Sequence, residues 1–208
     1  MALDQNLFGP VALTVNTLWT LNPDYPSLVL SLQKRGYRPS RLQDAIAEKG
    51  DFQITADSVR RVLGVRSASP ILVANGFKEL VEVLEKEMLV NLRTSVIFYE
   101  LIGSFRVTAD HNPLDRLNSV FGKAKILSQT RDIFGEEVAP FSLRLVPKGR
   151  HPDSLEWLDV TLEPILTSPA NKYYVGVVYR SVNMDKVMDF LSRVEEKIAQ
   201  LIEKIGGG

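Results

Sequence analysis

Hydrophobic residues recur most regularly near the C-terminal end of the chain. Between residues 184 and 205 the spacing alternates between three and four, which is a heptad repeat on a helix of about six turns. The heptad positions are Met184, Val187, Leu191, Val194, Ile198, Leu201 and Ile205. A seam this regular has to be covered, either by a sheet of the same chain or by another helix. Met188, Phe190 and Ile202 widen the apolar surface beyond a two-helix seam.

Alternating apolar and polar residues precede this helix in three segments. The segments lie around 141–145, 157–166 and 172–180, and proline-containing loops separate them. A period of two is typical of strands that have one buried face. The three segments therefore predict an antiparallel meander that packs against the C-terminal helix.

The N-terminal third shows the same kinds of pattern. Alternation over 11–21 predicts a strand, and Pro26 then favours the first turn of a helix that ends near Arg35. A short second helix is expected from Pro39 through Ala47. The region rich in Ile, Val and Thr that follows is expected to form two or three short strands, at 52–56, 59–65 and 71–74.

A second amphipathic helix is predicted in the middle of the chain. Asn75 is expected to cap it, and it should start at Gly76 or Phe77 and continue to about residue 93. Its apolar stripe consists of Leu80, Leu84, Met88 and Leu92. Residues 94–108 favour a strand, with Gly103 as a bulge or bend, and 114–121 favour a short helix.

The order of these elements predicts an α+β protein. We expect an antiparallel or mixed sheet with helices packed mainly on one face, in one domain of 208 residues. Strands followed by a long amphipathic helix occur twice, at about 52–93 and about 141–205. Two interpretations are open: ordinary α+β alternation, or a pseudo-twofold repeat of halves 1–103 and 104–208 that share one core.

Composition narrows the chemistry open to the chain. Lys plus Arg and Asp plus Glu both number 25, so the formal net charge is zero and only a local basic patch is available for a polyanion. The chain has no cysteine, which excludes disulfides, thiolate metal sites and cysteine nucleophiles. With two histidines, a zinc site of several histidines is also excluded. No apolar run approaches the roughly 20 residues of a spanning helix, and we expect a soluble, cytoplasmic protein.

Two carboxylates on one predicted strand are weak candidates for catalysis. Asp159 and Glu163 lie four residues apart, so both project from the same face, and Arg144 and Arg180 are expected on that face of neighbouring strands. Such a group could bind a metal or perform acid–base work with Asp159, Glu163 and Arg180. The alternative is an exposed sheet face crossed by ion pairs, each worth under about 1 kcal/mol.

Neither histidine is a strong candidate for a catalytic residue. Arg106 and His111 have an Arg-x4-His spacing, but the pair is predicted to straddle a strand end and a turn, with His111 exposed in a loop. His151 precedes Pro152 in a loop and needs no role as a solvated residue.

Basic residues with an aromatic among them form a candidate nucleic-acid site. The residues are Lys34, Arg35, Tyr37, Arg38 and Arg41. Cations with an interleaved aromatic can hold phosphates and stack bases. The alternative is a solvated helix end, where positive charge suits the helix dipole. A second cluster consists of Arg60, Arg61 and Arg66.

No motif of a common enzyme class is present, and no cofactor or metal is expected. Our first hypothesis is therefore a non-enzymatic assembly or partner-binding protein that acts as a homo-oligomer, most simply a symmetric dimer. The expected contact surface is the C-terminal helix, through Met184, Val187, Met188, Leu191, Val194, Ile198, Leu201, Ile202 and Ile205. The alternatives are an enzyme or ligand binder that uses the carboxylate face and a nucleic-acid-associated protein that uses the Arg-rich segments.

Overall fold

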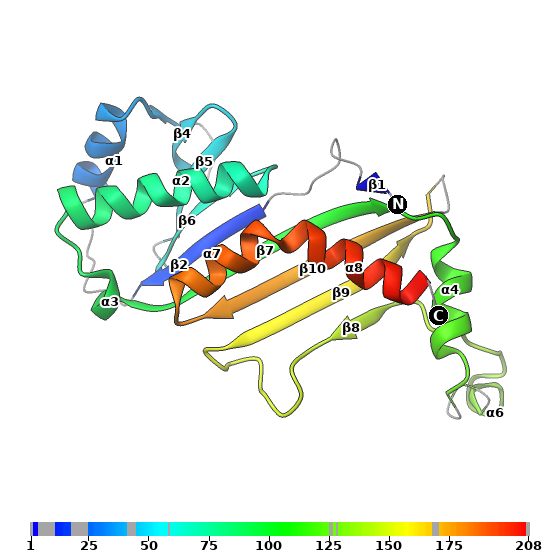
Figure 1. Ribbon diagram of the computed structural model, residues 1–208. Coiled ribbons are helices and arrows are strands. Elements are labelled where there is room, and N and C mark those ends of the chain that lie inside the picture. The colour runs from blue at the N-terminus through cyan, green and yellow to red at the C-terminus, as the bar shows by residue number, and fades with distance from the viewer. Residues whose placement is uncertain are drawn as a thin grey trace.

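In the part of the chain that the structure describes, ten strands form one antiparallel sheet (Figure 1). In the computed structural model the strands are β1 (Ala2–Leu3), β2 (Val11–Thr17), β3 (Arg38–Pro39), β4 (Ala45–Lys49), β5 (Phe52–Asp57), β6 (Val62–Ser67), β7 (Val96–Thr108), β8 (Leu143–Leu145), β9 (Trp157–Ile165) and β10 (Lys172–Ser181). Their order is β3-β4-β5-β6-β2-β7-β10-β9-β8, and β1 pairs with β7. The structure describes residues 2–3, 11–17, 25–40, 45–57, 59–124, 127, 129–167 and 171–206.

The long helices pack on the same face of this sheet (Figure 1). The helices are α1 (Tyr25–Lys34), α2 (Pro70–Glu82), the π-helix η2 (Val83–Glu87), α3 (Leu92–Ser95), α4 (Pro113–Phe121), α6 (Thr130–Phe134), α7 (Met184–Ser192) and α8 (Val194–Gly206). α2 contacts β2, β5 and β6, and α7 contacts β7 and β10. The predicted α+β class, with an antiparallel sheet and helices on one face, is confirmed.

Two successive segments of the chain each build one side of the sheet, and their strands and helices are connected in the same order. In each half the first strand lies at the centre, a helix leads to the outermost strand, and a meander returns to the centre before the last helix. We call the segment from β2 to η2 the first half and the segment from β7 to α8 the second half. β2 and β7 pair antiparallel, so the halves meet at the centre. The expected boundary at 103/104 falls inside β7; a sequence duplication stays a prediction.

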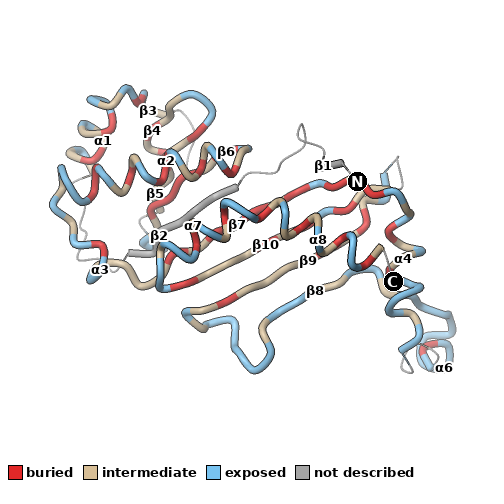
Figure 2. The backbone as a smooth tube through the Cα atoms, viewed as in Figure 1, coloured by how far each residue is buried: buried red, intermediate tan, exposed pale blue. Residues whose placement is uncertain are grey.

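One hydrophobic core joins the two halves. Leu101 and Phe105 of β7, Val65 of β6 and Val175 of β10 are fully buried on the helix-covered face. The same cluster extends from Leu28 in α1 through the helices α2 and α7 into α8. Figure 2 shows the buried positions following the strands and the inner sides of these helices. Alternation of apolar residues along the strands therefore selects which face the helices cover.

The C-terminal amphipathic segment differs from the predicted single helix. It is broken at Arg193, where the backbone has φ −119° and ψ 9°, into α7 and α8. Its buried positions are Val187, Leu191, Val194, Ile198, Ile202 and Ile205, while Met184 and Leu201 are only partly buried. An α-helix on a sheet keeps 3.6 residues per turn, because no partner helix imposes a supercoil, and a strict heptad stripe drifts around it. Ile202 is therefore buried against the core, where the heptad repeat had placed Leu201.

The middle helix starts earlier than predicted. α2 begins at Pro70, so the strand predicted at 71–74 and the cap predicted at Asn75 are both wrong. Pro70 is favourable in the first turn of a helix. Val73 is fully buried in the core, and such packing outweighs the strand preference of a β-branched residue. The helix ends in the π-helix η2, four residues before α3.

Three further local predictions are corrected. The helix predicted over 39–47 is wrong, because β3 and β4 lie at its two ends and 41–44 are outside the described residues. β6 begins at Val62 rather than Val59, because Arg61 adopts a left-handed turn conformation with φ 57°. No bulge occurs at Gly103, which pairs in register with Val177. The strand predicted over 11–21 is confirmed for 11–17, and 18–21 lie outside the described residues.

Gly76 sets the distance between α2 and the sheet. A Cβ atom there would lie 2.7 Å from the Phe52 ring and 2.9 Å from a Val65 methyl group. We expect Gly76→Val to lower the free energy of unfolding by about 1–3 kcal/mol, because either α2 or the side chains of Phe52 and Val65 must shift to make room. Urea unfolding measures this. Lys78→Val, an exposed change in the same helix, is the control and should cost less than half as much.

Candidate functional site

The outer strands of the second half carry apolar residues on the helix side of the sheet. Leu158 and Val160 of β9 pair with Tyr179 and Val177 of β10, and Leu145 of β8 pairs with Val160. Their side chains therefore share the face on which the helices pack. Leu162 farther along β9 is fully buried, but Val160 and Leu158 are partly exposed and Leu145 is 39% exposed. This end of the face is thus incompletely covered.

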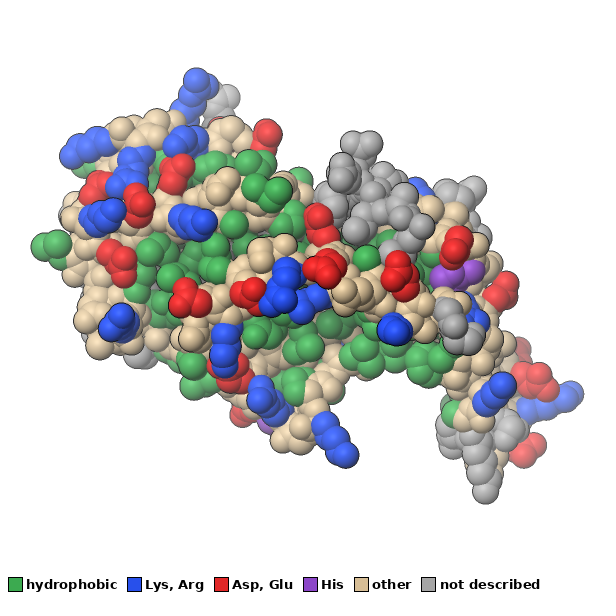
Figure 3. Space-filling view, viewed as in Figure 1, with side chains coloured by type: hydrophobic (Ala, Val, Ile, Leu, Met, Phe, Trp, Pro, Cys, Tyr) green, Lys and Arg blue, Asp and Glu red, His purple; other side chains and the backbone are tan. Residues whose placement is uncertain are grey.

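The helices α7 and α8 form one side of this uncovered area. Phe190 stacks on Tyr179 with ring centroids 4.2 Å apart and planes 8° from parallel. The Lys197 ammonium lies 5.6 Å from the Phe190 ring, and Leu201 lies one turn farther along the same side of α8. We call the resulting surface the apolar shelf; it consists of Leu143, Leu145, Leu158, Val160, Phe190 and Leu201. Figure 3 shows hydrophobic side chains gathered alongside α7 and α8, over β9 and β8.

The first half covers the equivalent area with its own helix. α1 contacts β3 and β4 and contributes Leu28 and Leu32, both fully buried. Ala47 of β4 and Ile54 of β5 are buried beneath it. In the second half the corresponding helix α4 contacts β9 and α8, and its buried apolar residues include Leu117. Leu145 of β8 remains exposed, so the two halves differ in how far they cover their outer strands.

The predicted carboxylate site lies on the opposite face of the sheet and forms ion pairs. Asp159 accepts a two-pronged hydrogen bond from Arg144, with Nη2–Oδ2 at 2.6 Å and Nε–Oδ1 at 3.0 Å. This bond raises the pKa of the Arg144 guanidinium. Arg180 does not join Asp159: its Nε donates to Glu100 Oε2 at 2.7 Å, and its guanidinium lies over Phe98. Asp159 and Glu100 therefore each neutralise an arginine.

A shallow hollow adjoins Asp159 on that face. Its volume is about 230 Å³, and Gly176 leaves the space that a side chain would fill. The Tyr174 and Ser104 hydroxyls at its side are 3.0 Å apart and bond to each other. Glu163 is opposite Tyr174 in the register, one strand away from this bond. Among the residues that the structure describes, no three His, Cys, Asp or Glu side chains come together as a metal site.

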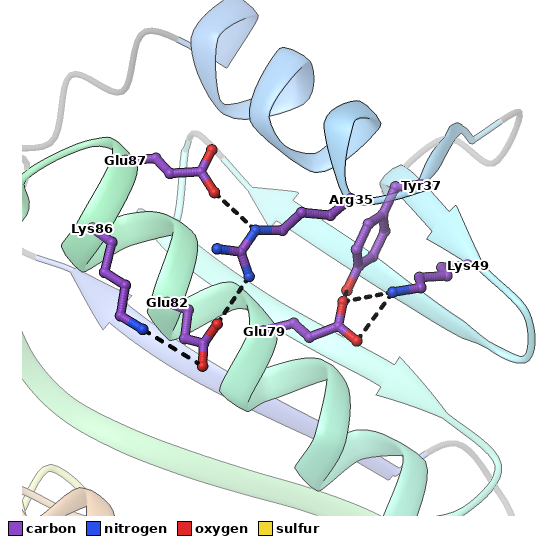
Figure 4. A network of polar contacts seen from close by, with 7 residues as sticks. All are labelled: Arg35, Tyr37, Lys49, Glu79, Glu82, Lys86 and Glu87. Carbon is purple, nitrogen blue, oxygen red and sulfur yellow. Dashed lines mark hydrogen bonds and ion pairs between the residues drawn. The ribbon is translucent and has the colours of Figure 1, made fainter.

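Two of the predicted nucleic-acid residues, Arg35 and Tyr37, are held by carboxylates of α2 and η2 (Figure 4). Arg35 donates to Glu82 at 3.0 Å and to Glu87 at 2.8 Å. The Arg35 bond and the nearby Lys86 lower the pKa of Glu82, and the bonds from Ser31 and Arg35 lower the pKa of Glu87. The charge of Arg35 is therefore neutralised within the chain.

The aromatic member of that set is unavailable for stacking. Tyr37 is 3% exposed, and its hydroxyl donates to Glu79 at 2.9 Å (Figure 4). Lys49 contacts the same carboxylate at 2.9 Å and the Tyr37 ring at 5.1 Å. Lys34 and Arg38 are exposed, and Arg41 lies outside the described residues.

The second Arg cluster is likewise engaged. Arg60 pairs with Asp57 at 3.6 Å, and Arg66 donates to the Gln53 side chain at 2.8 Å. Arg61 occupies the left-handed turn before β6 and is exposed. Local partners in and beside the strand pair β5–β6 therefore hold Arg60 and Arg66.

His111 does not pair with Arg106, the residue that the Arg-x4-His spacing suggested. His111 Nε2 lies 2.9 Å from the buried Tyr173 hydroxyl and its Nδ1 lies 2.9 Å from Asp110. His111 lies in the predicted loop before α4, but it is partly buried rather than exposed. Arg106 is opposite Tyr174, on the other face of β7. His151 is exposed, as predicted, and lies 3.0 Å from Asp153.

The sequence matches no protein-family model and no curated protein. Among the described residues, none of the helices combines the length and the apolar character needed to cross a membrane. The apolar shelf is the candidate site because its apolar side chains lie on the helix side of the sheet and stay partly exposed. The sequence placed Leu201 on the heptad seam and Phe190 among the residues that widen it. It did not connect them with Leu145 and Val160, because the pairing of β8 with β9 is decided by the tertiary structure.

Two buried tyrosines predict how stability depends on alkaline pH. Burial raises the pKa of Tyr173 to about 12, and burial together with the Glu79 bond raises that of Tyr37 still further. The folded state thus favours the neutral form of both phenols. The stability that this preference contributes is fully present below the ordinary tyrosine pKa of about 10, and it is lost as the pH rises toward the raised pKa of the folded state. We expect Tyr173→Phe to flatten the fall in unfolding free energy between about pH 10 and 12. Urea unfolding across that range measures it, with Tyr174→Phe, an exposed neighbour, as the control.

Proposed function

We propose that this chain is a non-enzymatic, partner-binding protein that assembles with itself, and that the apolar shelf is its contact surface. One observation carries the proposal: the second half leaves apolar side chains uncovered at a place where the first half buries them. Leu145 of β8 is 39% exposed, whereas Ala47 of β4 is 1% exposed, and each strand is the fourth of its half when counted from the centre of the sheet. Exposed apolar patches with polar surroundings are typical of interaction sites.

The contact surface proposed here differs from the one that the sequence suggested. Val187, Leu191, Val194, Ile198, Ile202 and Ile205 are buried within the chain's own core. They stabilise the monomer and cannot contact a partner while α7 and α8 remain docked on the sheet. Leu201 is partly exposed and belongs to the apolar shelf. The more exposed side of α7 and α8, rather than the heptad seam, would then meet the partner.

The charge pattern supports a binding role over catalysis. Asp159 and Arg180 are each engaged in an ion pair with another residue. A catalytic carboxylate needs a partly desolvated position from which it can reach a substrate. Both oxygens of the Asp159 carboxylate accept hydrogen bonds from Arg144, and this bidentate pair makes Asp159 a poor general acid or base.

Substitution in the apolar shelf should change the oligomeric state. We expect the wild-type mass to rise from one chain toward two as the concentration rises, and Leu145→Glu to keep it at one chain, because a buried unpaired charge opposes the contact. Size-exclusion chromatography with light scattering measures the mass. Ile71→Glu is the matched control: Ile71 is 72% exposed on α2, away from the shelf, and its substitution should leave the mass unchanged. A wild-type protein that stays monomeric at high concentration would contradict the proposal.

A further inference from the structure

A second exposed apolar segment follows α4. We call residues 130–138 the acidic arm. Ile133 is 63% exposed, Phe134 is 68% exposed and Val138 is 43% exposed. Large apolar side chains rarely gather so densely on a short surface segment unless they contact something. Figures 1 and 2 show α6 projecting beyond the sheet, with its surface exposed.

The acidic arm is held in a defined shape at its base. Thr130 is 5% exposed, and its hydroxyl donates to the Leu127 carbonyl at 2.7 Å. The Val138 amide donates back to the same hydroxyl at 3.4 Å, which joins the two ends of the arm. Gly135 ends α6 in a left-handed conformation with φ 76°, which favours glycine. Such a closed turn loses less entropy on binding than a free loop.

The charges of the acidic arm and of the apolar shelf are complementary. The arm has three carboxylates, Asp132, Glu136 and Glu137, against one arginine, Arg131, which lies 3.7 Å from Glu137, so its formal net charge is −2. The shelf is bordered by cations from two elements: Lys197 and Lys204 on α8, and Lys148 and Arg150 in the loop after β8. Of the neighbouring carboxylates, Asp189 pairs with Arg193, and Asp153 lies 3.0 Å from the exposed His151. Opposite charges around apolar centres favour association and fix its register.

We propose that the acidic arm of a second copy of this chain occupies the apolar shelf, with Phe134 and Ile133 on the apolar residues and Glu136 and Glu137 toward Lys197 and Lys204. This inference rests on the proposed function and names the segment that the shelf receives. In the first half α1 covers the outer strands; in the second half the arm of the other copy would do so.

A twofold dimer suits this contact because it makes the contact twice. In an isologous dimer, each copy offers its arm to the other copy's shelf and receives an arm on its own. Stable interfaces bury about 1,200–2,000 Å² in total. One short segment is small for that requirement, and the second, symmetry-related contact doubles the area. Phe134 is the aromatic anchor that such an interface would place at its centre.

Charge reversal tests the contact from both sides. We expect Lys197→Glu combined with Lys204→Glu to raise the dimer dissociation constant about tenfold, and Glu136→Lys combined with Glu137→Lys to do the same. Mixing the two variant chains should restore a mixed dimer to within about threefold of the wild type, because the opposite charges then face each other again. Analytical ultracentrifugation measures the constants. Phe134→Ser should weaken the dimer at least about tenfold, whereas Ile71→Ser should not.

Cysteine cross-linking locates the contact. The chain has no cysteine, so introduced thiols have no native competitor. Phe134→Cys on one chain, mixed with Leu145→Cys on another and oxidised, should give a covalent heterodimer, because a disulfide needs Cα atoms within about 7 Å. Ile71→Cys in place of Leu145→Cys should give none.

The outcomes separate this inference from the proposed function. Cross-linking at 134–145 together with charge rescue supports both. A dimer that is abolished by Leu145→Glu but is insensitive to the arm variants, and that gives no cross-link, overturns the arm contact and leaves the shelf as the contact surface. A strict monomer at every concentration overturns both.

Discussion

The structure depends on the need to cover one apolar face of a ten-stranded sheet. The two innermost strands, β2 and β7, pair with each other, so each half must supply helices for its own side. α2 approaches the sheet so closely that Gly76 has no space for a side chain. On the other side α7 places Val187 against β7 and β10, and α8 buries Ile198 and Ile202 in the same core. The burial of these residues is the largest favourable term in folding.

The two halves satisfy this constraint unequally, and the candidate site results from the difference. α1 completes the first half, and its C-terminal end is fixed to α2 and η2 by Arg35 and its two glutamates. The second half has α4 in the same place in the chain, but α4 packs at the end of β9 beside α8 and leaves Leu145 exposed. Incomplete coverage of a hydrophobic face costs stability. Such a cost is offset when a partner covers the face, which is the physical basis of the proposed assembly.

The sheet edges make a less suitable contact than the apolar shelf. β3 has two residues, one of which is Pro39, and β8 has three residues between Pro140 and Pro147. Short edge strands with proline resist pairing with the edge of another molecule, because proline supplies no amide hydrogen. Association through side chains on the helix face avoids extension of the sheet, and a symmetric dimer closes on itself. Because the formal net charge of the chain is zero, long-range charge repulsion does not oppose association of two copies.

The sequence by itself determined the elements whose pattern is local. The alternation over β7, β9 and β10, the first helix and the α+β class could be predicted, because strand and helix periodicity depend on neighbours a few residues away. The helix over 39–47 and the strand at 71–74 were wrong, since packing overrode propensity there. Only the tertiary structure decided that Arg180 pairs with Glu100 and Arg35 with Glu82, across 80 and 47 residues. It also decided which apolar face stays uncovered: exposure depends on what every distant segment covers, and no local pattern contains that information.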